Sequence, residues 1–332
     1  MKEIIDPIRK NSLIHLSQQH LCPRSHYCEI YDIMFMNFES LINSSTPLTE
    51  KKISVIKGLL NEMISNLPGD YNEILKLTLV PNQKKFQIYN SLNVCLLSIL
   101  IGKALNYSDQ ELLELGFAAL MHDLGMFAIE GLIYSGETFN QEHRQMLQQH
   151  PVSGLHILDQ FIKVTENIEK AVIQEHERED GSGYPEGING KNIHEFAKII
   201  AIADCFESLT HFRPYRKCVL PVDALQSILQ LSKSQFDRIM ANGMINALSL
   251  YPPGTCVRLA DGEIGIVTKV NPGSPLSPSV AVYYDRHGRE CRGEIQTIDL
   301  LEDDENYILR IIDLEAIDDL NALDSLREYP EH

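Results

Sequence analysis

Two parts of the chain hold the side chains that could do chemistry together. The downstream part combines an imidazole, a glycine-rich turn, a carboxylate and a basic pair: His176, Gly181-Ser182-Gly183-Tyr184-Pro185, Asp204, Arg213 and Arg216. The upstream part holds a His-Asp pair and a His-Pro pair: His122, Asp123, His150 and Pro151. Imidazole and carboxylate ligands together suit iron, manganese or zinc, and arginine donates to phosphate oxygens in a bidentate fork. These residue types predict a metal-dependent site for a phosphodiester.

Phosphodiester cleavage sets the demands on such a site. It needs an activated water and neutralised charge on the phosphoryl oxygens, and two metal ions supply both when a carboxylate bridges them. Neighbouring positions on a helix diverge by about 100°. We therefore expect Asp123 to bridge two ions while His122 binds one. His150, His176 and Asp204 should come from other helices, as in metal sites built inside helical bundles.

The elements that must position these residues are predominantly helical. From Pro81 to about Leu250 the apolar residues follow a helical period. One apolar face is made by Leu92, Cys95, Leu96, Ile99 and Leu100. A capping box, Ser108-x-x-Glu111, opens the helix that carries His122. Further helices are predicted at 140–149, 152–161, 166–178, 194–210, 221–231 and 234–248, with a loop rich in glycine and proline at 181–193.

The regions on either side differ in character. Residues 1–80 are predicted to be mainly helical, with breaks at Asn43–Pro47 and Leu67–Asp70, and they carry no motif. After Tyr251-Pro252-Pro253-Gly254, short strands are predicted at 257–259, 264–267 and 280–284, with turns at Asp261-Gly262 and His287-Gly288 and an acidic tail after Asp313. The chain should be mainly α, in three parts: a helical N-terminal region (1–80), the domain with the site (81–250), and a β extension with the tail (251–332).

The bulk composition narrows the classes of partner and compartment. The formal net charge of −17 argues against a broad surface for nucleic-acid polymers or anionic membranes, which would need clustered Lys and Arg. The seven cysteines form no CxxC pair, which suits a reducing compartment. The N-terminal residues lack the apolar core of a signal peptide, and no apolar run approaches the ~20 residues that span a bilayer. We expect a cytoplasmic protein.

The motifs, taken in order, give a specific resemblance. They are HD at 122–123, HP at 150–151, HERxDGxGYP at 176–185, AD at 203–204 and RPYR at 213–216. From about Pro81 to Gly254 the chain resembles the HD-GYP family, a bacterial branch of the HD phosphohydrolases. The resemblance implies an all-helical domain of the HD type that hydrolyses the second messenger cyclic di-GMP. The segment from Tyr251 onward also resembles the family's usual C-terminal extension.

The resemblance implies a binuclear metal centre. One ion would be held by His122, Asp123 and Asp204. A second would be held by Asp123, His150 and His176, with Asp123 bridging the ions and positioning the nucleophilic water. The cofactor would be one or two divalent transition-metal ions, iron or manganese by preference.

The resemblance also implies how the substrate is bound. Gly183 and Tyr184 would shape the substrate rim, while Arg213 and Arg216 would meet the phosphates of cyclic di-GMP. A protein partner could dock through residues 1–80. Neither a nucleic-acid polymer nor a membrane is expected as a partner.

Three positions depart from the family's pattern. Asn90 stands where the family has a histidine ligand, and a carboxamide is a poor ligand beside imidazole, so the first ion should bind more weakly. Met126 replaces the lysine of HDxGK and offers a phosphate neither a hydrogen bond nor positive charge. Glu175 replaces the first histidine of an HH pair; because glutamate can still ligate, we count it among the metal ligands.

Three carboxylates should converge at this site without the family's lysine. Asp123, Glu175 and Asp204 would then raise one another's pKa unless a cation lies among them. The convergence of these carboxylates therefore favours a bound metal ion. The apolar Met126 and Phe127 are more typical of core packing than of catalysis.

The departures leave two functions open. One is an active phosphodiesterase with altered or reduced activity, because each lost transition-state contact can cost ~100-fold. The other is a non-catalytic module that binds cyclic di-GMP or a partner protein and transmits a signal. A histidine elsewhere, such as His143, His156 or His194, could replace the missing imidazole. We favour the enzyme.

Overall fold

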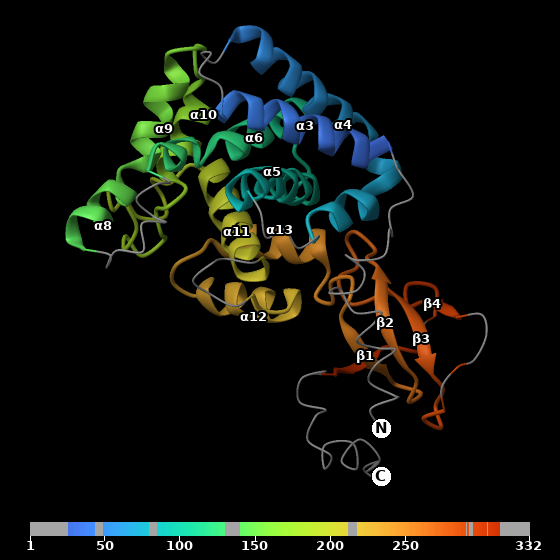
Figure 1. Ribbon diagram of the computed structural model, residues 1–332. Helices are drawn as coiled ribbons and strands as arrows, with labels where there is room; N and C mark the ends of the chain where they lie inside the picture. Colours follow the sequence, from blue (N-terminus) through green and yellow to red (C-terminus); the bar gives the residue numbers. More distant parts are fainter. Residues whose placement is uncertain are drawn as a thin grey trace. The chain divides into compact units, whose positions relative to one another are not determined.

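A computed structural model describes residues 26–43, 49–79, 85–129, 140–211, 218–289, 291, 295–303 and 305–312. Its contacts divide the chain into a helical unit within Cys22–Ala247 and a second unit that includes Leu248–His332. Figure 1 colours both along the sequence. The first unit is built of helices and the second holds a small antiparallel sheet, so the predicted mainly α fold is confirmed.

The helical unit is built around α5 (Phe86–Ala104). Nearly every side chain from Gln87 to Gly102 is buried, as expected for a helix that is apolar on all faces. α5 packs against α6 (Asp109–Met121) and α11 (Glu195–Thr210), and it also contacts α3 (His26–Asn43) and α4 (Glu50–Leu77). In Figure 1 it lies at the centre of these helices.

The other helical elements follow along the chain: η1 (Leu124–Ile129), α8 (Gln141–Gln148), α9 (His150–Asp159), α10 (Glu166–Gln174), α12 (Pro221–Leu231) and α13 (Arg238–Leu248). η1 packs against α9, and α10 contacts α6, α9 and α11. These contacts bring the ends of α6, α9 and α10 toward α11. The predicted domain boundary at residue 80 stays a prediction, although α3 and α4 contact the helices that follow it.

α4 runs without interruption through Pro68 and Gly69, so the predicted break at Leu67–Asp70 is wrong. Proline and glycine in a helix interior cost about 3 and 1 kcal/mol relative to alanine. Buried apolar side chains on both sides of the pair, such as Ile64 and Ile74, offset that cost. Packing of the apolar face therefore overrides local helix propensity here.

α6 begins at the predicted capping box. The Ser108 hydroxyl accepts from the backbone N–H of Glu111, and the Glu111 carboxylate accepts from the backbone N–H of Ser108 at 2.8 Å. Among the described residues, Asp109–Ile129 forms one segment long and apolar enough to cross a membrane, and 61% of its window is buried inside the structure. Such burial is typical of a core helix, and it places the C-terminal end of α6 inside the unit.

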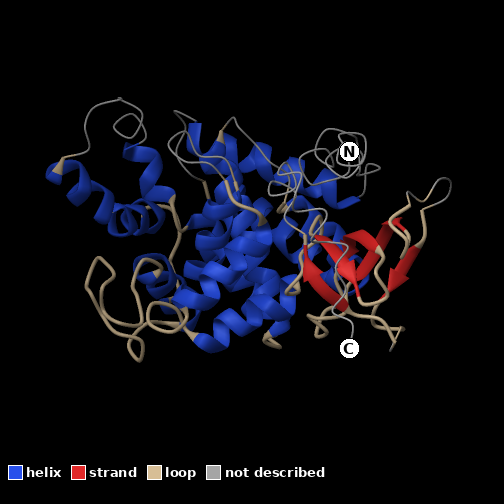
Figure 2. Cartoon of the chain, turned by 90° about the horizontal axis from the view of Figure 1, so that it is seen from below, coloured by secondary structure: helices blue, strands red, loops and turns tan. Residues whose placement is uncertain are grey.

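The second unit carries a five-stranded antiparallel sheet in the order β4-β3-β2-β1-β5, drawn in red in Figure 2. Its strands are β1 (Cys256–Leu259), β2 (Ile264–Lys269), β3 (Ser279–Tyr284), β4 (Thr297–Asp299) and β5 (Ile308–Ile311). The sequence predicts the first three and misses the two short edge strands. Gly262 and Gly288 adopt positive φ angles of 98° and 73° at the predicted turns. Apolar clusters around Val267 and around Ile266 lie on the two faces.

Candidate metal centre

The predicted metal ligands come from the ends of three helices and the interior of a fourth. They are His122 and Asp123 at the end of α6, His150 at the start of α9, Glu175 and His176 at the end of α10, and Asp204 within α11. His122 and Asp123 both follow the last residue of α6, and His122 keeps helical backbone angles of φ −53° and ψ −43°. The structure thus brings all six side chains to one centre, in two overlapping groups.

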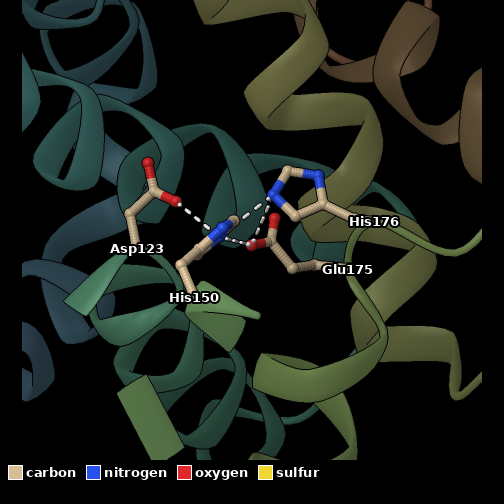
Figure 3. A group of neighbouring side chains, drawn as sticks. All are labelled: Asp123, His150, Glu175 and His176. Carbon is tan, nitrogen blue, oxygen red and sulfur yellow. Dashed lines mark hydrogen bonds and ion pairs between the residues drawn. The ribbon is translucent and has the colours of Figure 1, made fainter. Parts of the chain in front are cut away.

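The larger group is Asp123, His150, Glu175 and His176, which point toward one another in Figure 3. Nε2 of His150 lies 3.2 Å from Oδ1 of Asp123 and 3.2 Å from Nε2 of His176. Oε1 of Glu175 lies 3.2 Å from Nε2 of His176 and 3.7 Å from Nε2 of His150. One potential ligand atom from each residue lies within 4.8 Å of the others, close enough to hold one ion.

The smaller group is His122, Glu175 and Asp204. Nε2 of His122 lies 3.9 Å from Oδ1 of Asp204 and 3.5 Å from Oδ2 of Asp123. Asp123 therefore faces histidines of both groups, as a bridging carboxylate would. Glu175 belongs to both groups, which the sequence analysis did not anticipate.

The donor atoms of these groups fit a metal ion. Both carboxylate oxygens of Glu175 and Nε2 of His122 are buried without a hydrogen-bond partner among the described residues. A buried carboxylate is costly unless a cation pairs with it, and within the described part of the metal-free protein only the protonated imidazoles beside Glu175 take that place. Nδ1 of His122 and Nδ1 of His150 face the carbonyls of Ala119 and Leu147 at 2.7 and 2.6 Å. Each must donate there, which leaves Nε2 as the metal-facing nitrogen.

Proton affinities at the centre differ widely. Burial on its own would lower the pKa of His122, but the carboxylates of Asp123, Glu175 and Asp204 raise it to about 9. Burial likewise opposes protonation of His150, while its contacts with Asp123 and Glu175 raise its pKa to about 10. Burial lowers the pKa of His176 to about 4. Metal-free protein therefore carries protons on two imidazoles that a metal would need to displace.

The three carboxylates do not behave alike. Burial, together with the charges of Asp123 and Glu175, raises the pKa of Asp204 to about 6. Despite its burial, Asp123 keeps a pKa below its ordinary value because His122 and His150 adjoin it. The pKa of Glu175 is also lowered, against burial, by His176 and His122. The expected mutual rise in pKa thus holds for Asp204 alone, since the histidines offset repulsion at the other two.

Asn90 lies beside the smaller group. Its side-chain nitrogen donates to Oδ1 of Asp204 at 3.0 Å and to Oε2 of Glu207 at 2.7 Å. Asn90 thus supplies hydrogen bonds where the family has a ligand, and Glu207, which the sequence analysis did not single out, joins the centre.

The loop after His176 is pressed against the ligand segment. A Cβ at Gly183 would lie 2.4 Å from the carbonyl oxygen of His176 and 2.4 Å from Cα of Glu177, so only glycine fits. The Tyr184 ring stacks on the His176 ring with centroids 4.6 Å apart. The buried Glu177 carboxylate accepts from the backbone N–H groups of Glu186 and Gly187 at 2.8 and 3.0 Å. Gly183 therefore acts through close packing, and Tyr184 is the residue that reaches the site.

A cavity of about 190 Å³ opens onto the centre. Its lining comprises the site residues Asn90, Asp123, His150, His176, Tyr184 and Asp204, with Phe86, Gln87, Met126, Leu147 and Ser208. Met126 thus faces the cavity and not the core, contrary to the packing role expected of it. Phe127 does pack internally, edge-on to Phe38 with ring centroids 6.2 Å apart.

Other predicted residues lie away from this cavity or outside the described residues. Arg213 and Arg216 belong to 212–217, which the structure does not describe. His156 is exposed, and His194 caps α11 by accepting from the backbone N–H of Phe196 at 3.2 Å. Neither of them, nor His143, belongs to the cavity lining or to the ligand groups. A substitute imidazole from these three positions is not found.

Two family models match the chain. One is described as a KOW domain associated with HD domain and covers residues 256–320. The other, described as an HD domain, covers residues 39–240, more than half of the chain. The chain belongs to the HD-domain family. The match includes all six candidate ligands described above.

Relatives of this HD-domain chain include two bacterial enzymes. One is a cyclic di-GMP phosphodiesterase of Pseudomonas aeruginosa, 28% identical over 233 residues, which cover 70% of this chain and 56% of the relative. The other is a cyclic di-GMP phosphodiesterase of Borreliella burgdorferi, 24% identical over 200 residues, with 59% and 52% covered. The chain thus spans little more than half the length of these relatives.

Further similarities agree with the same family branch. A 3'3'-cGAMP-specific phosphodiesterase of Vibrio cholerae is 32% identical over 143 residues, which cover 42% of this chain and 30% of that enzyme. An HDGYP protein from Bdellovibrio bacteriovorus superposes with a TM-score of 0.55 at 14% identity, covering 70% of this chain and 75% of that one, and shows the shared fold. The predicted membership of the HD-GYP branch is confirmed.

Two kinds of residue at this HD-domain centre were not predicted from the sequence: polar residues on α5 and α11, and residues that only line the cavity wall. Glu207 follows Asp204 by three positions on α11, so the two carboxylates share a helix face, and an acidic residue within that apolar helix was a readable signal. Gln87 precedes Asn90 by three positions on α5 and lines the cavity. Phe86, Leu147 and Ser208 carry no chemical signal in the sequence, because only the tertiary fold assigns them to the cavity wall.

Proposed function

We propose that this protein is a metal-dependent phosphodiesterase that opens cyclic dinucleotides, with cyclic di-GMP as its substrate. The observation that carries the proposal is the pair of overlapping ligand groups around Glu175, beside a cavity. The substrate class is supported by the activities named for the relatives in Pseudomonas, Borreliella and Vibrio.

The ligand groups indicate which residues would hold the metal ions. Asp123, His150, Glu175 and His176 would hold one ion, and His122, Glu175 and Asp204 the other. When bound, divalent iron or manganese would polarise the phosphoryl oxygens and lower the pKa of an attacking water. Asp123 lies between histidines of both groups and is our candidate for orienting that water.

The cavity residues suggest how the substrate is held. A volume of about 190 Å³ is below the ~300 Å³ at which small-molecule pockets commonly begin, so the scissile phosphodiester fits there and the rest of the dinucleotide extends outside. Burial raises the pKa of Tyr184, so its phenol stays protonated and can donate to a phosphate oxygen. Arg213 and Arg216 would bind the outer phosphate.

A binding module without turnover is the second candidate. Met126 presents a thioether to the cavity where the family supplies an ammonium group. Asn90 donates to two carboxylates where the family has a histidine ligand. Both changes weaken transition-state stabilisation more than ground-state binding.

The setting of the protein forms part of the same proposal. We place it in the cytoplasm because the six described cysteines are all free thiols. A protein partner acting through residues 1–80 would provide the input to the enzyme.

The test compares two histidine variants on one helix. The full chain, reconstituted with Mn²⁺ or Fe²⁺, should convert cyclic di-GMP to a linear product. His150→Ala should lose at least about 100-fold in kcat/KM, since it removes a ligand, whereas His156→Ala, an exposed histidine on α9, should match the wild type. Binding of cyclic di-GMP without product in the wild type would reject the enzyme and leave the binding module.

A further inference from the structure

A chain of buried hydrogen bonds leads from α3 to Asp204. The Tyr31 hydroxyl donates to Oδ1 of Asn93 at 2.8 Å, and Nδ2 of Asn93 lies 3.4 Å from Oε1 of Glu207. The other Glu207 oxygen accepts from Nδ2 of Asn90 at 2.7 Å, and the same nitrogen donates to Oδ1 of Asp204 at 3.0 Å. Hydrogen bonds between side chains of α3, α5 and α11 thus lead to Asp204, a proposed metal ligand.

The members of this chain are shielded from water. Asn90, Asn93 and Glu207 are 2%, 1% and 1% exposed, and Tyr31 is 7% exposed. Buried polar groups must find partners within the protein, and linked hydrogen bonds strengthen one another where the dielectric is low. Burial raises the pKa of the Tyr31 phenol, so its hydroxyl remains a donor near neutral pH.

The direction of each bond is fixed by its partners. Glu207 is the branch point: one oxygen faces Asn93 and the other faces Asn90. A carboxylate held on both sides cannot rotate without breaking one contact. The orientation of Asn90 therefore depends on Glu207, and the position of Oδ1 of Asp204, 3.9 Å from Nε2 of His122, depends on Asn90.

We propose that Tyr31, Asn93, Glu207 and Asn90 are positioning residues that hold Asp204 in its ligand orientation. This inference rests on the proposed metal centre. Through Tyr31, the position of α3 then influences how tightly the His122–Glu175–Asp204 group binds its ion. Displacing Tyr31, by mutation or by a partner acting on α3, weakens binding of that ion. It does not weaken binding of the ion held by His150 and His176.

The experiment measures Mn²⁺ affinity of the full chain by calorimetric titration. The binding step that Asp204→Asn abolishes identifies the smaller group. Tyr31→Phe keeps the ring and should weaken that step by about 10-fold, the lower end of the loss seen when outer partners of metal ligands are removed. Tyr71→Phe is the matched control: it deletes a tyrosine hydroxyl that donates to the Ala247 carbonyl at 2.8 Å, outside the chain of bonds. It should leave both steps unchanged.

A double-mutant cycle tests the coupling itself. In an Asn90→Ala background the series of hydrogen bonds from Tyr31 to Asp204 is already broken. Adding Tyr31→Phe should therefore cause no further loss of Mn²⁺ affinity. Equal losses in both backgrounds, or equal effects of Tyr31→Phe and Tyr71→Phe, would overturn the inference. Mn²⁺ binding with the predicted coupling but no turnover would reject the phosphodiesterase alone. A wild type that binds neither Mn²⁺ nor Fe²⁺ would reject both proposals.

Discussion

Position 90 shows how one side chain changes the chemistry of the centre. Oε2 of Glu207 lies 2.7 Å from Nδ2 of Asn90. If position 90 held a histidine, one ring nitrogen could bind the metal while the other donated its N–H to this oxygen. Asparagine retains the hydrogen bond to Glu207 and adds one to Asp204. In place of an imidazole, the protein therefore has a side chain that donates to two carboxylates, one of which belongs to the candidate ligand Asp204.

Met126 leaves the cavity without the positive charge that a lysine supplies at this position in the family. Met126→Lys should raise kcat on cyclic di-GMP, by up to about 100-fold, because it adds a cation where charge develops on the phosphate. The matched control is Met36→Lys, which adds the same charge at a methionine that is 58% exposed on α3. Steady-state kinetics measure kcat for both variants. Equal kcat values would show that the missing ammonium group does not limit turnover.

Metal binding should depend steeply on pH. In the metal-free protein the pKa of His122 is about 9 and that of His150 about 10, so both are protonated at pH 7 and must release protons to ligate. Affinity should therefore rise as pH increases from 7 toward 9, about tenfold per unit for each proton released. His176, with a pKa of about 4, contributes nothing in this range. Competition titrations with a chelator of known pH dependence measure the slope; a flat profile would contradict the assigned protonation states.

At the scale of elements, the loop from His176 to Ile193 is fixed to the helical unit at several points. Glu177 holds the backbone at Glu186 and Gly187. Lys198 on α11 forms ion pairs of 2.9 Å with Glu179 and 3.0 Å with Asp237. α11 therefore carries Asp204 and, through Lys198, also anchors the loop that presents Tyr184.

Gly183 is the position at which this loop tolerates no side chain. Gly183→Ala places a Cβ 2.4 Å from the His176 carbonyl oxygen, so the loop must shift and the stack of Tyr184 on His176 is lost. We expect a loss of at least about 10-fold in kcat/KM, as misplacement near a reacting centre typically causes. The control is Gly58→Ala on α4, where a Cβ meets nothing within 4 Å. It should keep full activity and stabilise the protein by about 0.5–1 kcal/mol in chemical denaturation. Unchanged activity of Gly183→Ala would show that the loop's position does not matter.

Across the whole molecule, residue type, spacing and the resemblance to the HD-GYP family predicted which side chains would meet at one centre, because metal chemistry restricts candidate ligands to few residue types. His122, Asp123, His150, Glu175, His176 and Asp204 all reach one centre. The hydrogen-bond chain could not be predicted, since Asn90 and Glu207 are 117 positions apart and only packing of α5 on α11 joins them. Local signals also failed in α4, where packing overrides Pro68, and in β4 and β5, the two edge strands, where few side chains are buried and no apolar run spans the strand.

If the protein is a metal-dependent phosphodiesterase, its turnover must depend on the amount of metal bound. Chelator-stripped protein is titrated with Fe²⁺ or Mn²⁺, and metal content and cyclic di-GMP hydrolysis are measured on the same samples. We predict at least one ion per chain and turnover that rises in proportion to the metal bound. Protein that binds no ion while remaining folded, or hydrolysis that is independent of metal content, would contradict a metal centre organised around Glu175.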